Sequence, residues 1–209
     1  MKYNSSDTAS KRQYRMDRRA AAAQETARSI IQATIDLYMD RWLEDLTLDD
    51  VAARANVTVQ TVLRRFGSKA ELIQAVGESL LRQVMSQRSQ APVGDVEGAV
   101  ANLVEHYEAT GDLMLRTLAQ EGRHAALSAF AEQGRAVHRA WVMAVFAPFL
   151  EAQPPAGRQS LLSRLIVVMD LYSWKLLRRD MGLGRDETER EMVELVYAVL
   201  DRASQGERK

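Results

Sequence analysis

Apolar residues recur along this chain at helical spacing. After the alanine run at residues 20–23, Ile31, Ile35, Tyr38 and Trp42 lie at positions i, i+4, i+7 and i+11, which is the spacing of one helix face. No stretch alternates apolar and polar residues with β-branched enrichment, and the chain contains only four prolines. The pattern therefore predicts an all-α protein whose first long helix ends near residues 40–43.

Two short helices joined by a tight turn are predicted next. Thr47 and Asp50 have the spacing of a capping box and predict a helix over 48–54. Asn56 suits the left-handed residue that stops this helix, and Thr58 suits the cap of the following one. This arrangement is typical of a helix-turn-helix.

The second helix of the pair, predicted over 59–65, has one apolar side and one polar side. The apolar side would seat it on the preceding helices, through Val51, Val57, Val62 and Phe66. The other side has no acidic residue and offers several hydrogen-bond donors; its residues are Val59, Gln60, Thr61, Arg64 and Arg65. Such a face is suited to DNA.

The rest of the chain is predicted to be helical as well. Ser68 would cap a helix over 69–88, and further helices are expected near 95–109, 112–121, 124–150, 158–181 and 187–204. About nine helices and three parts follow. Residues 1–20 form a basic, disordered arm, 21–67 a three-helix DNA-binding domain, and 68–209 a larger helical domain.

Charge is unevenly distributed although the formal net charge is zero. Residues 1–20 contain six basic and two acidic side chains, so the remainder carries a surplus of four negative charges. A basic end on an acidic body suits approach to a polyanion. The arm, with Arg12, Arg15, Arg18 and Arg19, would either enter a minor groove or only raise local attraction to DNA.

Composition excludes several classes of protein. Hydrophobic residues make up 46% and charged residues 27% of the chain, which is ordinary globular usage. No apolar run approaches the length of a membrane span, and the polar N-terminus does not resemble a signal peptide. Because cysteine is absent, disulfides and thiolate metal sites are excluded, and we expect a cytoplasmic protein without a cofactor.

As a set, these spacings resemble the DNA-binding domain of the TetR family of bacterial regulators. The resemblance covers residues 28–72 and rests on Ile30-Ile31, Leu37-Tyr38, Leu48, Val51-Ala52, Ala55-Asn56-Val57-Thr58, Thr61-Val62, Phe66, Ser68-Lys69 and Leu72. It implies a homodimer that places two recognition helices on a palindromic double-stranded DNA operator. It also implies an effector pocket and a dimer interface in the C-terminal domain. Repression is the commoner mode of the family.

The resemblance also assigns candidate DNA contacts. Thr47 and Lys69 match family positions that touch phosphates, and Thr58, Val59, Gln60 and Thr61 match the recognition helix. Leu63 departs from the family, which usually has an aromatic residue there, and Arg64-Arg65 replace an aromatic or histidine pair. Phosphate contact would then move to the arginines.

General chemistry divides these contacts by role. Gln60 can bond adenine bidentately and Arg64 can read guanine, whereas phosphate contacts fix the register of the protein on DNA. We therefore expect base readout from Gln60 and Arg64. Positioning is expected from Thr47, Arg65 and Lys69.

The C-terminal helices are apolar over more than one stripe. Helices over 158–181 and 187–204 each show a second apolar side, which favours a four-helix interface between two subunits. A small hydrophobic or aromatic effector is expected to contact Tyr107, Met114, His138, Trp141, Met169 and Tyr172. An ordinary helical core is the competing interpretation of these residues. Effector entry would shift the helix over 69–88 and change the distance between the recognition helices.

Other classes of function are less well supported by the sequence. Glu121 and His124 have the spacing of a carboxylate-bridged metal motif, but such sites need two copies and further glutamates. An enzyme is therefore not expected. An effector-independent architectural DNA binder or scaffold of the same fold remains the alternative. A membrane-surface role of residues 1–20 lacks apolar anchors.

Overall fold

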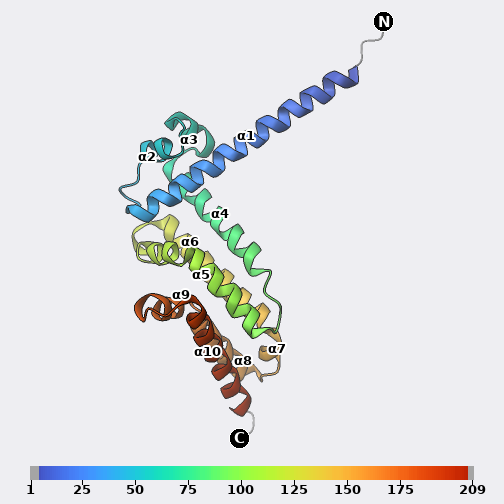
Figure 1. The fold of residues 1–209 in the computed structure, drawn as a ribbon, viewed down its shortest axis with the longest axis vertical. Helices are drawn as coiled ribbons and strands as arrows, with labels where there is room; N and C mark the ends of the chain where they lie inside the picture. Colours follow the sequence, from blue (N-terminus) through green and yellow to red (C-terminus); the bar gives the residue numbers. More distant parts are fainter. Residues whose placement is uncertain (1–4, 207–209) are drawn as a thin grey trace. The chain divides into compact units, whose positions relative to one another are not determined.

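The computed structural model describes the backbone of residues 5–206 and the side chains of residue 14 and residues 16–205. Helices account for the regular structure of this range, which contains no strand, so the prediction of an all-α chain is confirmed. The elements are α1 (Ser5–Asp40), α2 (Leu48–Arg54), α3 (Val59–Phe66), α4 (Lys69–Arg88), α5 (Val96–Leu118), η1 (Glu121–Arg123), α6 (Ala125–Val145), α7 (Ala147–Glu151), α8 (Pro155–Val168), α9 (Leu171–Lys175), η2 (Leu176–Asp180) and α10 (Arg185–Gly206) (Figure 1).

The first helix begins earlier than the sequence interpretation placed it. Ser5–Asp40 is one helix of 36 residues, so residues 5–20 are helical where a disordered arm was expected. Residues 5–23 contain no glycine or proline, and residues 18–23 are arginines and alanines, which favour helix over coil. Residues 1–4 of the expected arm lie outside the described residues.

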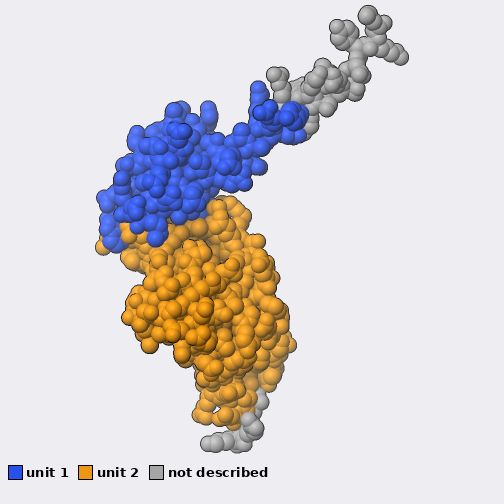
Figure 2. All heavy atoms as spheres, in the orientation of Figure 1, with its two compact units in different colours: residues 1–77 blue, residues 78–209 orange. Residues whose placement is uncertain are grey.

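The chain divides into two compact units, residues 1–77 and 78–209 (Figure 2). We had expected the boundary after residue 67, at the start of α4. The observed boundary lies inside α4 because its first turns belong to the N-terminal unit, where Leu72 is fully buried and Lys69 bonds to the Leu43 carbonyl. One continuous helix therefore contributes residues to both units.

The N-terminal unit packs α1 against α2 and α2 against α3. Its buried side chains include Ile30, Leu46, Val51, Val62 and Leu72. The predicted seating of the third helix is confirmed for Val51 and Val62, whereas Val57 and Phe66 are half-buried. The polar face of α3 is consequently turned away from this core.

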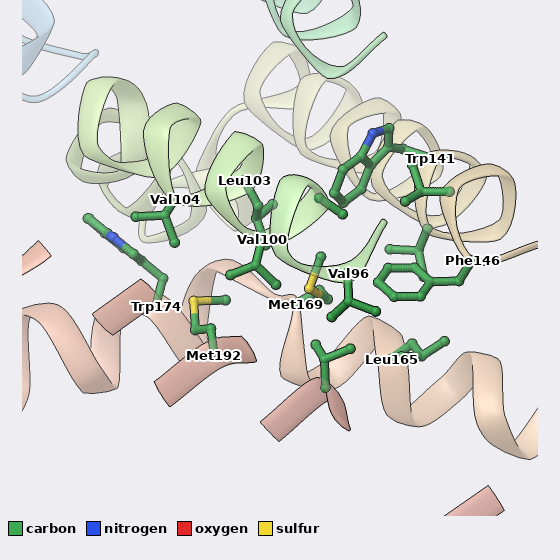
Figure 3. Packing of buried hydrophobic residues seen from close by; sticks show 14 of the residues in the cluster. Val96, Val100, Leu103, Val104, Trp141, Phe146, Leu165, Met169, Trp174 and Met192 are labelled. Atoms are coloured by element: carbon green, nitrogen blue, oxygen red, sulfur yellow. The ribbon is translucent and has the colours of Figure 1, made fainter. Parts of the chain in front are cut away.

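The C-terminal unit is built around α5. Val100 and Leu103 of α5 lie in the middle of this core (Figure 3). Trp141 of α6 and Phe146, its C-cap residue, pack on one side, and Leu165 of α8 and Met192 of α10 pack on the other. All of these side chains are buried. No helix among residues 5–206 is long and apolar enough to cross a membrane.

A break expected near residues 110–111 does not occur, because α5 runs unbroken from Val96 to Leu118. Gly111 serves packing rather than a turn: a Cβ atom built on it would lie 2.5 Å from the ring of Trp174. Trp174 is fully buried, and its indole N–H donates to Glu108 at 3.0 Å. The glycine therefore lets the indole lie directly on the helix backbone.

Replacing Gly111 by alanine is expected to destabilise the protein by about 1–3 kcal/mol, because the fixed indole cannot move away from the new methyl group. Gly134 is the matched control, since it is also helical and nothing lies within 4 Å of its added Cβ. Gly134→Ala should stabilise by about 0.5–1 kcal/mol through helix propensity. Thermal unfolding followed by circular dichroism measures both. Equal shifts of the same sign would contradict the packing role of Gly111.

The prediction of one helix over 158–181 is wrong, because α8 ends at Val168 and the chain turns at Met169 and Asp170 before α9 begins. The Asp170 carboxylate accepts the Tyr172 backbone N–H at 2.9 Å and caps α9, a signal not recognised in the sequence. Lys175, the last residue of α9, donates to Asp180 at 2.7 Å within the same chain.

Candidate nucleic-acid interface and internal cavity

The turn between α2 and α3 follows from one residue in the left-handed region. Asn56 has φ of 53°, as its position after α2 predicts. The Val57 N–H donates to the Ala52 carbonyl at 2.9 Å and the Asn56 N–H to the Ala53 carbonyl at 3.2 Å, which together form a Schellman motif. This motif sets the angle between the two short helices.

The start of α2 carries the predicted capping box. The Asp50 N–H donates to the Thr47 hydroxyl oxygen at 3.1 Å, and the Thr47 N–H donates to the Asp50 carboxylate at 3.2 Å. The bonds from Thr47 lower the pKa of Asp50, and Arg41, 3.0 Å from the carboxylate, lowers it further. The Thr47 hydroxyl, a candidate phosphate contact, is therefore already bonded within the cap.

Thr58 holds the N-terminus of α3. Its hydroxyl accepts the Thr61 backbone N–H at 3.2 Å and lies 3.0 Å from the Thr61 hydroxyl. Val59 at the first helical position is half-buried, and Gly67 ends the helix with φ of 84°. The expected caps at both ends of α3 are thus present.

Substitution of Thr58 by alanine is expected to cost about 1 kcal/mol of folding stability, because an N–H at the start of α3 loses its acceptor. Thr58→Ser keeps the oxygen and should retain most of the stability. Urea unfolding of the two variants at one protein concentration measures the difference. Indistinguishable midpoints for the two variants would show that the hydroxyl contributes nothing.

Gln60 and Arg64 are the unengaged polar side chains of α3. Both are exposed, and within the described residues neither forms a hydrogen bond or an ion pair. They are four residues apart and so lie on the same side of the helix. Since α3 has no acidic residue, this side can approach a phosphate backbone without like-charge repulsion.

Arg65 and Lys69 have partners inside the N-terminal unit. The Arg65 guanidinium donates to the carbonyl of Ala23 in α1. The Lys69 Nζ donates to the carbonyls of Leu43 and Glu44 at 2.7 and 3.4 Å, just beyond the end of α1. Arg65 therefore braces α1 and Lys69 braces the loop that follows it. A phosphate contact requires each cation either to keep this bond as well or to give it up.

A cavity of about 200 Å³ lies in the C-terminal unit. Four of the six expected effector contacts line it: Tyr107, Met114, His138 and Tyr172. The lining is completed mainly by apolar side chains of α4, α5 and α6, including Leu81, Val84, Leu118 and Phe130. A mostly apolar cavity with a few polar groups is the usual form of a small-molecule site.

The other two expected contacts, Trp141 and Met169, do not line the cavity. Met169 is fully buried in the core, and its backbone carbonyl accepts the Tyr107 hydroxyl at 3.2 Å. Trp141 is also buried, and its indole N–H donates to the Arg88 carbonyl at 3.0 Å. The sequence predicts both as effector contacts because residue type alone does not distinguish an aromatic residue or methionine of the core from one that lines a cavity.

Arg88, the last residue of α4, lines the cavity and was not anticipated from the sequence. It is only 5% exposed, and its guanidinium carbon lies 4.3 Å from the Trp141 ring centroid and 5.6 Å from that of Tyr107. A signal was present, because Leu81, Val84 and Arg88 share one helix face at i, i+3 and i+7. A cation on the buried, otherwise apolar face of a helix indicates that the side chain binds a polar group inside the C-terminal unit.

The groups around Arg88 are held in neutral form. Burial, aided by the positive charge of Arg88, lowers the pKa of His106 to about 3 and that of His138 to about 4. Burial raises the pKa of Tyr107 to about 12. Burial also lowers the pKa of Arg88, but a guanidinium keeps its charge at neutral pH.

The Glu-x-x-His motif at 121–124 does not form a metal site with other side chains. Glu121 pairs with Arg135 at 2.9 Å beside the cavity. Among the described residues, no group of three or more histidine and carboxylate side chains is placed to hold a metal ion.

Comparison with known proteins places the N-terminal part in one family. The sequence model of the bacterial regulatory proteins of the tetR family matches residues 30–76. The HTH-type transcriptional regulator SrpR of Pseudomonas putida is 40% identical over 57 residues, 27% of this chain and 27% of that protein. The HTH-type transcriptional repressor Rv3405c of Mycobacterium tuberculosis is 31% identical over 100 residues, 48% of this chain and 44% of that protein. The similarity thus spans less than half the length of either relative.

The similarity of fold extends further than the similarity of sequence. A transcriptional regulator from Rhodococcus sp. Rha1 has a crystal structure that superposes with a TM-score of 0.66 at 16% identity, over 84% of this chain and 96% of that chain. The resemblance inferred from residues 28–72 is confirmed by the match to residues 30–76. These relatives are all named as regulators, and none of them is named as an enzyme.

Proposed function

Because this chain belongs to the TetR family of bacterial regulatory proteins, we propose that it is a sequence-specific DNA-binding repressor. It would bind a palindromic operator as a homodimer and leave it when a small molecule enters the cavity of the C-terminal unit. The observation that carries the proposal is the face of α3, on which Gln60 and Arg64 are exposed and unengaged next to a turn of helix-turn-helix geometry.

The proposed reading of DNA assigns separate roles to two sets of side chains on α3. Thr58 and Thr61 lie at its N-terminus, where backbone N–H groups and the helix dipole favour a phosphate. Gln60 and Arg64 would meet base edges in the major groove. The relative Rv3405c is named as a transcriptional repressor, which supports repression over activation.

Apolar side chains on the last helices support a dimer. Val167 of α8 is 64% exposed and Leu195 of α10 is 41% exposed, and the two helices pack against each other within the unit. The second apolar stripe expected on these helices is partly used by the chain itself, since Val168, Val193, Tyr197 and Leu200 pack against the core. The exposed side chains of Val167 and Leu195 would therefore contact a second subunit. In this dimer, α8 and α10 of each subunit would form a four-helix interface.

Control by a small molecule would act through α4. This helix begins in the N-terminal unit with Lys69 and Leu72 and ends with three side chains that line the cavity, Leu81, Val84 and Arg88. A ligand that favours one position of the end of α4 would change the spacing of two recognition helices. Half-sites must lie about 34–36 Å apart, so a small shift suffices to weaken binding.

Selection of bound duplexes from a random DNA pool tests the proposal. The purified full chain at near-physiological salt should recover a palindrome, and sedimentation of the complex should show two chains per duplex. Recovery of no motif, with binding that vanishes as salt rises, would contradict the proposal. It would favour the architectural DNA binder of the same fold.

A further inference from the structure

We infer that the cavity of the C-terminal unit takes an organic anion, with a carboxylate bound by Arg88 and an apolar or aromatic body among the side chains of α5 and α6. The inference rests on the proposed effector role of this cavity and adds the chemical class of the ligand. It starts from a buried cation, Arg88, for which the described residues supply no ion-pair partner.

Arg88 is charged, buried and incompletely bonded. Within the described residues it forms no ion pair, its Nε has no hydrogen-bond partner, and one Nη donates to His138 Nδ1 at 3.5 Å, a long distance for such a bond. The rings of Trp141 and Tyr107 stabilise the cation through their faces. The Tyr107 hydroxyl also interacts with the guanidinium, but as a neutral group it supplies no counter-charge. A buried charge in this state is costly, and a carboxylate would supply both the missing charge and the missing acceptors.

The carboxylates of the cavity wall are engaged elsewhere. Asp170 caps α9 through the Tyr172 N–H at 2.9 Å. Glu121 pairs with Arg135 at 2.9 Å, and the Arg135 side chain is 59% exposed. His106 and His138, whose pKa values are lowered by burial, add no second positive charge at neutral pH. Arg88 is therefore the buried positive charge that faces the cavity.

The remainder of the wall suits the body of such a ligand. Met114 and Leu118 of α5, Phe130 of α6 and Leu171 of α9 offer apolar surface. A dry cavity of about 150 Å³ is already large enough for one aromatic ring, and this one is about 200 Å³. The ligand class is thus a carboxylate on a body of one or two rings.

Isothermal titration calorimetry of the full chain without DNA tests the inference with three probes of one shape: 1-naphthoate, 1-naphthamide and 1-naphthylmethylammonium. Charge-assisted bonds are about twice as strong as neutral ones, so we expect the carboxylate to bind about tenfold or more tighter than the amide, and the ammonium weakest. Equal affinities for the three probes, or no binding of any, would overturn the inference. This comparison needs no variant.

Variants then locate the anion site. Arg88→Met should remove the preference for the carboxylate while the amide still binds, and Arg88→Lys should retain part of it. Arg135→Met is the matched control, because it removes a lining cation that is already paired, and it should keep the preference. A preference that survives Arg88→Met in a folded protein, as judged by circular dichroism, would assign the anion to another group.

The same probe separates this inference from the proposed function. 1-Naphthoate is added to the chain bound to its selected duplex. Release of the duplex at a concentration of the carboxylate about tenfold lower than that of the amide is the expected result. Binding of 1-naphthoate in calorimetry without release of the duplex would support the anion site and contradict effector control. Binding of the duplex by a chain that shows no preference for the carboxylate would support the regulator and overturn the anion site.

Discussion

Acidification below pH 6.5 is expected to destabilise the C-terminal unit strongly, through the two histidines beside Arg88. Burial and the Arg88 charge lower the pKa of His106 to about 3 and of His138 to about 4 in the folded chain. A histidine in the unfolded chain titrates near 6.5. Between these values the unfolded state binds more protons, so its free energy falls relative to that of the folded state as pH decreases.

The stability contributed by neutral burial is therefore fully present above pH 6.5. It is lost progressively as pH falls toward the folded-state values of about 4 and about 3. At pH 4.5 the loss should amount to about 2–3 kcal/mol for each histidine, or about 5 kcal/mol together. An effect of this size is a large fraction of the stability of an ordinary domain.

Urea unfolding at pH 7.5 and 4.5, at one protein concentration, measures the effect. Trp42→Phe restricts the fluorescence signal to Trp141 and Trp174, which are buried in the C-terminal unit. Replacing both histidines by asparagine keeps an acceptor for Arg88 and removes the titration, so this variant should lose most of the pH dependence. If the free energy of unfolding falls with pH equally in the double variant and in the protein with both histidines, groups other than these histidines cause the pH dependence.

Loss of operator recognition is expected when Gln60 and Arg64 are both replaced by alanine. One bidentate base contact contributes about 1–3 kcal/mol of discrimination. Each contact occurs twice on a palindrome, so either single substitution should weaken specific binding by about 2–6 kcal/mol, which is about 30-fold to more than 10⁴-fold. Affinity for random duplex should fall much less, since phosphate contacts supply it.

Fluorescence anisotropy with the selected duplex and a scrambled duplex checks this result. Arg139→Ala is the matched control, because Arg139 is an exposed arginine of the other unit and forms no ion pair with any described residue. It should leave the ratio of the two affinities unchanged. A fall of the same size on both duplexes for Arg64→Ala would show that Arg64 contacts phosphate and does not read a base.

The helix-turn-helix could be predicted from the sequence because its determinants are local. Thr47, Asn56 and Thr58 each fix the backbone through a partner within five residues, and the structure shows each of these caps. Gly111 shows the opposite case. Its role depends on Trp174, 63 positions away along the chain, and no local pattern indicates that contact.

The cavity was predicted only in part for the same reason. Tyr107, Met114, His138 and Tyr172 line it, but Trp141 and Met169 belong to the core. Residue type is shared by core and lining, and the difference arises from how α4 packs beside α5 and α6. Arg88 was missed because it ends a helix in the sequence, where a cation usually serves the helix dipole.

The most direct test of the central claim is the ratio of affinities for the selected palindrome and a scrambled duplex, measured from 50 to 200 mM salt. A sequence-specific dimeric regulator should bind the palindrome at least about 10³-fold tighter, with the preference retained as both affinities fall with salt. Equal affinities for the two duplexes at every salt concentration would contradict the account and leave only electrostatic attraction to DNA.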